Sequence, residues 1–164
     1  MMKRILAIAA VAVLLAGCAG SVSAPEPITA LSPAQKSALR ISDITADAAP
    51  DVQMSDGDFG LIAQNVRSYI GAKSPQVFAD QNGALKMRIH FTKFDRGNAF
   101  ARSMLIGLGQ IVIEADVTLL DPSGKMVAEY KVSKDFALGG MMGAMTTVED
   151  VEDGFAKSVA EVVK

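Results

Sequence analysis

The chain has 164 residues, of which 50% are hydrophobic and 21% charged, a composition typical of one globular domain with a core of normal size. Its formal net charge is −2, and without Lys3 and Arg4 the balance is 14 basic against 18 acidic residues. This balance argues against nucleic-acid binding, which needs a basic face to displace counterions. With no Trp and one His, the sequence also offers no histidine metal cluster.

Residues 1–18, MMKRILAIAAVAVLLAGC, have the pattern of an export signal. Lys3 and Arg4 form a charged start, and an apolar run follows over residues 5–16. This run is too short to span a bilayer comfortably but is typical of a signal-peptide core. It ends in Leu-Ala-Gly-Cys, which resembles the bacterial lipobox. The resemblance implies that residues 1–17 are removed and that Cys18 becomes the lipid attachment site.

Cys18 is the only cysteine in the chain, so it cannot form an intrachain disulfide. The alternative is an ordinary secretory signal with an incidental cysteine. Several acyl chains, palmitate among them, would anchor the protein stably, at about 0.8 kcal/mol per buried methylene. In enteric-type bacteria an aspartate after the cysteine favours inner-membrane retention, so Ala19 favours the outer membrane. We therefore expect a lipid-anchored envelope protein that faces the periplasm.

Residues 18–37 are predicted to be the lipidated N-terminus and a flexible tether. The stretch holds three prolines and many small residues. Residues 38–164 are predicted to be a single domain. Leu39, Ile41 and Ile44 predict its first strand.

Two helices are predicted. Ser55 and Asp58 have the spacing of a capping box, and apolar residues recur at helical spacing over 56–72. Thr146 and Glu149 have the same spacing before an apolar stripe that runs to the C-terminus.

Three further strands are predicted at 84–94, 111–120 and 126–136, where apolar and polar residues alternate. The turn sequence at 121–124, Asp-Pro-Ser-Gly, joins the last two strands. The element order is therefore β-α-β-β-β-α. We expect an α+β fold with a mostly antiparallel four-stranded sheet and two helices on one face.

Two apolar, glycine-rich loops, at 95–110 and 138–145, should meet at one end of this sheet. They form either an exposed interaction surface, as methionine-rich patches do, or a small extension of the core. The glycines and Asn98 suit turns, Arg102 suits hydrogen bonds to carbonyls, and the apolar residues would make the contacts. The candidate interaction residues are Gly97, Asn98, Arg102, Met104, Leu105, Gly107, Gly109, Met141 and Met142.

No catalytic, metal or cofactor site is predicted. Gly107 and Gly109 do not continue into a phosphate-binding motif, and they precede a strand instead of opening a helix. His90, Glu114 and Asp116 could gather on the polar face of the sheet as a metal or acid–base site. The alternative for these three is a solvated face of cross-strand pairs. We therefore do not expect an enzyme.

The run Arg-Gly-Asn-Ala-Phe-Ala-Arg at 96–102, the Gly-Leu-Gly at 107–109 and the Leu-Asp-Pro-Ser-Gly-Lys at 120–125 together resemble a known family. It is the bacterial lipoprotein family labelled domain of unknown function 4410. The similarity covers roughly residues 38–163 and is most specific over 94–126. Gln110 departs from the small residue common in the family at that position. The resemblance implies the anchor and the fold, and it leaves the function open.

The sequence thus predicts a non-catalytic interaction or accessory module, anchored in the membrane by its acyl chains and bound to an envelope protein through the loops. One alternative is a small-molecule or lipid binder that uses a pocket between the loops. A weaker alternative is an enzyme that uses the polar sheet face.

Overall fold

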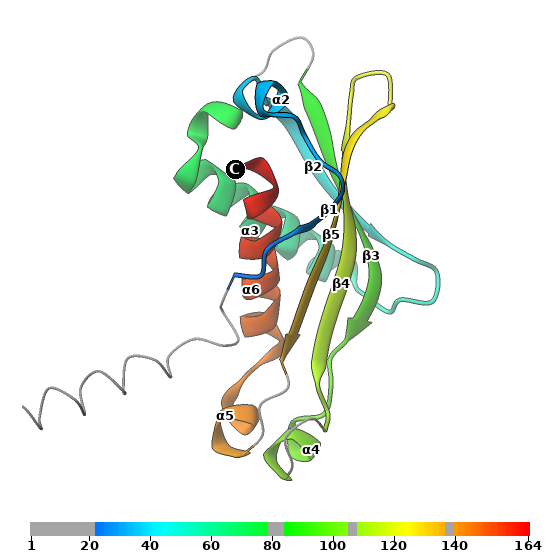
Figure 1. The fold of residues 1–164 in the computed structure, drawn as a ribbon. Helices are drawn as coiled ribbons and strands as arrows, with labels where there is room; N and C mark the ends of the chain where they lie inside the picture. The colour runs from blue at the N-terminus through cyan, green and yellow to red at the C-terminus, as the bar shows by residue number, and fades with distance from the viewer. Residues whose placement is uncertain (1–21, 79–83, 105–107, 137–139) are drawn as a thin grey trace, which may run out of the picture.

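The computed structural model describes residues 22–78, 84–104, 108–136 and 140–164 (Figure 1). Its core is a five-stranded sheet in the order β1-β5-β4-β3-β2. The strands are β1 (Glu26–Thr29), β2 (Ile41–Ala48), β3 (Leu85–Asp95), β4 (Ile111–Leu120) and β5 (Met126–Phe136). The α-helices are α2 (Pro33–Ser37), α3 (Asp56–Lys73), α4 (Ala99–Met104), α5 (Gly140–Met145) and α6 (Val148–Ala160). Short 3-10 turns follow at η2 (Pro75–Val77) and η3 (Glu161–Val163).

The α+β class is confirmed, but the predicted sheet is wrong in two details. The sheet has a fifth strand, β1, and β2 runs parallel to β3 while the other neighbours are antiparallel. The parallel pair has a physical cause, because α3 lies between β2 and β3 in the chain. A crossover of that length returns the chain to the starting end of the neighbouring strand.

The predicted flexible tether is wrong over residues 26–37. In β1, Glu26 lies opposite Lys131 of β5, and Leu31 is 4% exposed. The backbone N–H of Leu31 donates a 3.0 Å hydrogen bond to the Tyr130 hydroxyl. This segment covers the free edge of β5, where Pro27 is tolerated because an edge strand does not need every donor.

Helices α3 and α6 pack on one face of the sheet, as predicted (Figure 1). The rings of Phe59 in α3 and Phe155 in α6 lie 6.1 and 5.5 Å from the Phe91 ring of β3, measured between centroids. The alternating residues of β4 that face the helices are all buried. The predicted bounds of β4 and β5 match the structure.

The capping box of α6 lies one residue later than the predicted pair of Thr146 and Glu149. The side chain of Thr147 accepts from the backbone of Asp150, and the Asp150 carboxylate accepts from the backbone of Thr147. The predicted box at Ser55 and Asp58 is present at the start of α3.

The molecule is elongated along the sheet, with different structures at its two ends (Figure 1). The β4–β5 hairpin marks one end, and α4 and α5 lie together at the other. Within the described ranges, none of the helices combines the length and the apolar character needed to cross a bilayer.

Candidate functional site: an apolar tip at one end of the sheet

The two glycine-rich segments meet at one end of the sheet, as predicted. Each contains a short helix that the sequence analysis treated as loop: α4 follows β3, and α5 follows β5. The two helices contact each other beyond the end of the sheet (Figure 1). Each has six residues, too few for a helical period to be recognised in the sequence.

Large apolar side chains on these segments are exposed. Phe100 is 75% exposed, Met104 66% and Met141 79%, and Leu108 and Met145 are also open to solvent. For these residues the alternative of a buried extension of the core is wrong. We call this set the apolar tip: Phe100, Met104, Leu108, Met141 and Met145.

Several predicted residues cannot be placed at the tip. Cys18, Leu105 and Gly107 lie outside the described residues. The side chains of Arg102 and Met142 also lie outside the description, although their backbones belong to α4 and α5. The predicted contact of Arg102 with backbone carbonyls therefore stays a prediction.

The base of the tip is a close backbone crossing. The N–H of Asn98 donates a 3.1 Å hydrogen bond to the carbonyl oxygen of Gly109. Gly97 and Gly109 have φ values of +63° and +61°, in the left-handed region that favours glycine. A β-carbon on Gly97 would lie 2.3 Å from the Gly109 carbonyl oxygen, so even alanine does not fit there. The predicted need for glycine at 97 and 109 is confirmed.

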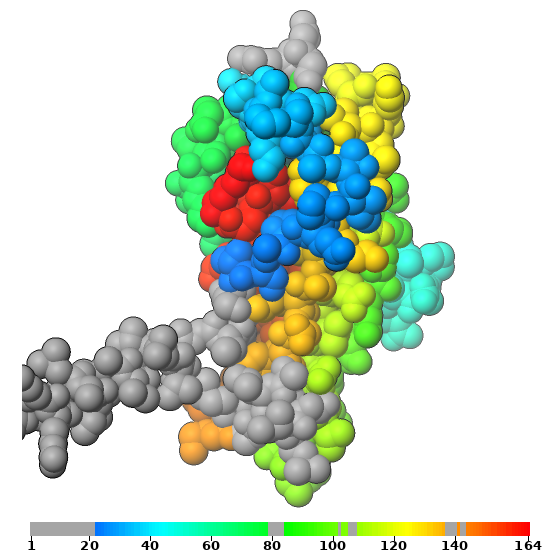
Figure 2. All heavy atoms as spheres, viewed as in Figure 1, coloured from blue at the N-terminus to red at the C-terminus, as the bar shows by residue number. Residues whose placement is uncertain are grey.

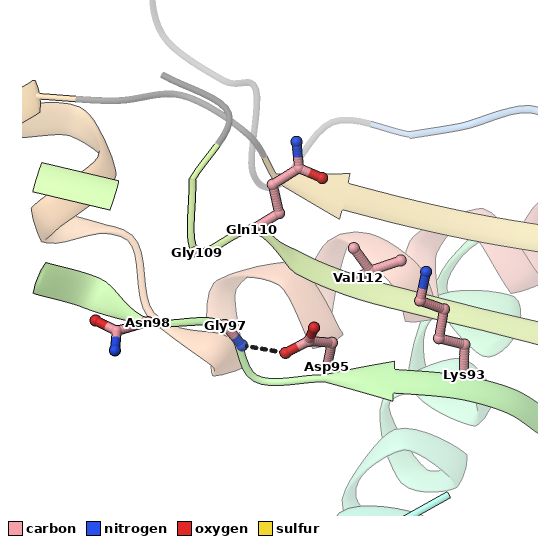
Figure 3. A pocket seen from close by; sticks show the side chains of 7 residues that line it. All are labelled: Lys93, Asp95, Gly97, Asn98, Gly109, Gln110 and Val112. Atoms are coloured by element: carbon pink, nitrogen blue, oxygen red, sulfur yellow. Dashed lines mark hydrogen bonds between the residues drawn. The ribbon is translucent and has the colours of Figure 1, made fainter. Parts of the chain in front are cut away.

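Side chains complete this base. The amide oxygen of Asn98 accepts a 3.0 Å hydrogen bond from the N–H of Ala101 at the start of α4. The Asp95 carboxylate accepts a 2.8 Å bond from the N–H of Gly97, which Figure 3 shows. The predicted turn role of Asn98 is confirmed, and Asp95 is an additional turn residue. The tip is thus held by backbone geometry, which leaves its apolar side chains free to make contacts.

A polar hollow of about 490 Å³ lies beside this base (Figure 3). Lys93 and Asp95 come from the end of β3, and Gln110 and Val112 come from the chain that enters β4. Most of its lining is polar, and the apolar tip does not line it. It therefore does not suit an acyl chain, and it is not the pocket predicted between the apolar loops.

The polar face of the sheet forms cross-strand pairs. Asp47 of β2 accepts hydrogen bonds of 2.6 and 3.0 Å from Arg88 and also contacts the ring nitrogen of His90. The hydrogen bond from Arg88 holds the pKa of Asp47 below its usual value. Glu114 lies 3.9 Å from Lys93 on the neighbouring strand.

The predicted set of His90, Glu114 and Asp116 therefore does not converge on one point. His90 lies opposite Asp116 in the register, but Glu114 pairs with Lys93 instead. One oxygen of Asp116 is buried without a hydrogen-bond partner among the described residues. No group of three or more potential metal ligands occurs in the described part of the chain. Sequence reasoning missed Asp47, because the parallel pairing of β2 was not predicted.

A buried acid near the start of α6 was also missed. Glu152 is 3% exposed, and burial raises the pKa of its carboxyl above the usual value. The charge of Asp58 raises this pKa further, while Arg96 opposes the shift. Arg96 donates a 2.8 Å hydrogen bond to Asp58, which connects the base of the tip to the start of α3. Glu152 follows Val151, which belongs to the apolar stripe of this helix, and this position is the sequence signal that could have indicated its burial.

Comparison with solved structures supports the fold. A PelC dodecamer from Paraburkholderia phytofirmans superposes with a TM-score of 0.51 and 10% identity, covering 85% of this chain and 98% of that one. A variant PelC dodecamer from the same organism gives a TM-score of 0.55 and 10% identity, covering 85% of this chain and 95% of that one. At this identity the likeness establishes the shared fold alone. None of the curated proteins matches the chain.

A family model also matches part of the chain. The model described as "Domain of unknown function (DUF4410)" matches residues 64–140, from the middle of α3 to the start of α5. This range includes the glycine-rich base of the tip and the turn between β4 and β5. The resemblance predicted from the sequence is confirmed over residues 64–140, which match the model of this family.

Proposed function

We propose that the chain is a lipid-anchored, non-catalytic interaction module of the bacterial cell envelope, with the apolar tip as its contact surface. The observation that carries the proposal is the gathering of four large, exposed apolar side chains on two helices that contact each other, with exposed Leu108 just before β4 as the fifth. A soluble protein rarely leaves such a group together without a partner, because burying it lowers the free energy by about 25 cal/mol per Å².

The architecture of the tip supports a binding role. Gly97 and Gly109 build a rigid base whose geometry tolerates no side chain, and Asp58 ties Arg96 of this base to α3. A rigid base with adaptable methionines above it suits a contact surface. The anchor is proposed from the lipobox resemblance, with Cys18 as the attachment site and the periplasmic face of the outer membrane as the location.

Catalysis has less support than binding. The polar sheet face pairs its carboxylates with Arg88, His90 and Lys93, as a solvated face does. The polar hollow contains Lys93 and Asp95, but Asp95 already accepts a hydrogen bond from the backbone of Gly97. The proposal therefore assigns no reaction to either surface.

Two experiments on the full chain test the proposal. Cys18→Ser should remove the protein from the membrane fraction or leave it unprocessed, because the thioether cannot form. A photo-crosslinking residue at Met104 should form adducts in cells, and one at Met126, at the opposite end of the molecule, should not. Normal processing and membrane retention of Cys18→Ser would contradict the anchor. Equal crosslinking from both positions would contradict the tip as contact surface.

A further inference from the structure

We infer that the partner of the apolar tip is the lipid bilayer itself, and that Phe100, Met104 and Met141 insert into the membrane that holds the acyl chains on Cys18. The inference rests on the proposed lipid anchor. In this inference the partner that the tip contacts is a lipid surface and not a protein.

The first argument is the short length of chain outside the fold. Because β1 pairs with β5 and Leu31 is buried, the predicted tether of residues 18–37 does not separate the domain from the membrane. The described chain begins at Val22, and the N–H of Ser23 already donates a 2.8 Å hydrogen bond to the Ser158 hydroxyl of α6. From Cys18 to Val22 a fully extended chain spans at most ~14 Å, at ~3.3–3.6 Å per residue. An acylated Cys18 therefore keeps the domain against the bilayer.

The second argument is where that point of attachment lies. Ser158 is ten residues after Val148, so it lies ~15 Å along the α6 axis from the start of the helix, at 1.5 Å per residue. The start of α6 is the end next to α5, and α5 carries Met141 and Met145 (Figure 1). The reach from Val22 therefore brings Cys18 about level with the start of α6, the end of the helix next to the tip. The β4–β5 hairpin lies at the far end of the molecule (Figure 1).

The third argument is the chemistry of the tip. Helices α4 and α5 contain one charged residue, Arg102, and no acidic residue. Such a surface meets no repulsion from phosphate headgroups, and its Phe, Leu and Met side chains enter the boundary between headgroups and acyl chains at low cost. In Figure 2 the coloured atoms of α4 and α5 lie at that end of the molecule, away from the packed sheet and the α6 helix.

The size of the tip also favours lipid over protein. A stable protein interface uses about 20–30 residues a side, many more than the five apolar side chains here. A membrane contact needs no matching surface, because the anchor already holds the tip at a high effective concentration near the lipid. The tip then acts as a second attachment point that fixes the orientation of the domain.

Single-tryptophan variants test this directly, because the chain has no Trp of its own. Full-length Phe100→Trp and Met126→Trp are purified with their native acyl chains and inserted into phosphatidylcholine vesicles with bromine atoms in the acyl chains. Both positions are exposed in the structure, but they lie at opposite ends. We expect Phe100→Trp to lose roughly half of its emission to the bromines, since interfacial side chains reach ~5–10 Å into the boundary. Met126→Trp should be unaffected.

The other outcomes separate the two ideas. Vesicle-bound protein with acylated Cys18 and no quenching of Phe100→Trp would overturn the membrane inference and leave the anchor intact. A blue-shifted but unquenched Phe100→Trp would mean that the tip is covered by protein, including a second copy of this chain, and would also overturn it. If the protein purified from cells carries no acyl chain on Cys18 and does not bind the vesicles, the proposed anchor is contradicted and the inference loses its basis.

Discussion

A β-carbon on Gly97 would lie 2.3 Å from the carbonyl oxygen of Gly109, and both residues have left-handed backbone conformations. The two glycines therefore form the base of the apolar tip, and their substitution is the first prediction. Gly97→Ala should lower the free energy of unfolding by more than the ~1–2 kcal/mol cost of the left-handed conformation alone. Urea denaturation measures this change.

Gly124→Ala is the matched control. Gly124 also has a left-handed conformation, with φ of +84°, but an added β-carbon would meet nothing within 4 Å. Gly124→Ala should therefore lose only the free energy that the left-handed conformation costs, with no steric contribution. Equal losses for the two variants would mean that the close approach of Gly97 and Gly109 contributes nothing.

The exposed methionines should be dispensable for folding. Met104→Ala and Met141→Ala, alone or together, should change the free energy of unfolding by less than about 0.5 kcal/mol, as surface substitutions usually do. Met87→Ala provides the control, because Met87 of β3 is 0% exposed and its truncation should cost about 2–5 kcal/mol. A large loss of stability in the tip variants would show that the tip belongs to the core.

The segment before β2 should contribute to stability, although its sequence predicts a tether. Leu31→Ala should cost about 2–5 kcal/mol, because Leu31 is buried against the domain. Ile28→Ala, at a 57% exposed position of β1, should have little effect. The two melting temperatures decide the matter. If Leu31→Ala were as stable as Ile28→Ala, the segment would not be packed on the domain. The flexible tether would then be correct, and Cys18 could lie farther from the domain.

Glu152→Gln should stabilise the protein at neutral pH. Burial raises the pKa of Glu152 in the folded state. As the pH rises above the unfolded pKa, the carboxyl ionises more readily in the unfolded chain, so the free energy of unfolding falls until the pH passes the folded pKa. The amide removes this penalty. Well below the ordinary pKa of 4.5 the carboxyl is protonated in both states, and the advantage of the variant should disappear. Urea denaturation at pH 7 and in acid measures both effects, and the same advantage at both pH values would contradict this account.

The sequence predicted those elements whose own pattern is periodic. In β4 and β5, strict alternation and the Asp-Pro-Ser-Gly turn at 121–124 gave the correct bounds. Helix α3 was also found, because its apolar spacing and its capping box at Ser55 agree. In each case the local pattern and the tertiary burial point to the same element.

The elements that depend on tertiary partners were not predicted. Strand β1 is formed by its pairing with the edge of β5, and nothing in its four residues indicates that pairing. The parallel direction of β2 follows from the crossover through α3. The order of elements is visible in the sequence, but it does not by itself say that β2 lies next to β3. The composition of the tip was recognisable, but its exposure depends on α4 and α5 packing beyond the end of the sheet.

Methionine oxidation in intact membranes tests the central claim most directly, because the chain carries its own probes. Met104, Met141 and Met145 belong to the tip, and Met126, on the hairpin at the opposite end, is 46% exposed. In an uncovered protein the tip methionines, which are more exposed, should oxidise at least as fast as Met126. Our account predicts the reverse in the native envelope, with the tip methionines protected and Met126 oxidised, as read by mass spectrometry of each peptide. Tip methionines that oxidise as fast as Met126 there would contradict a contact surface at the tip.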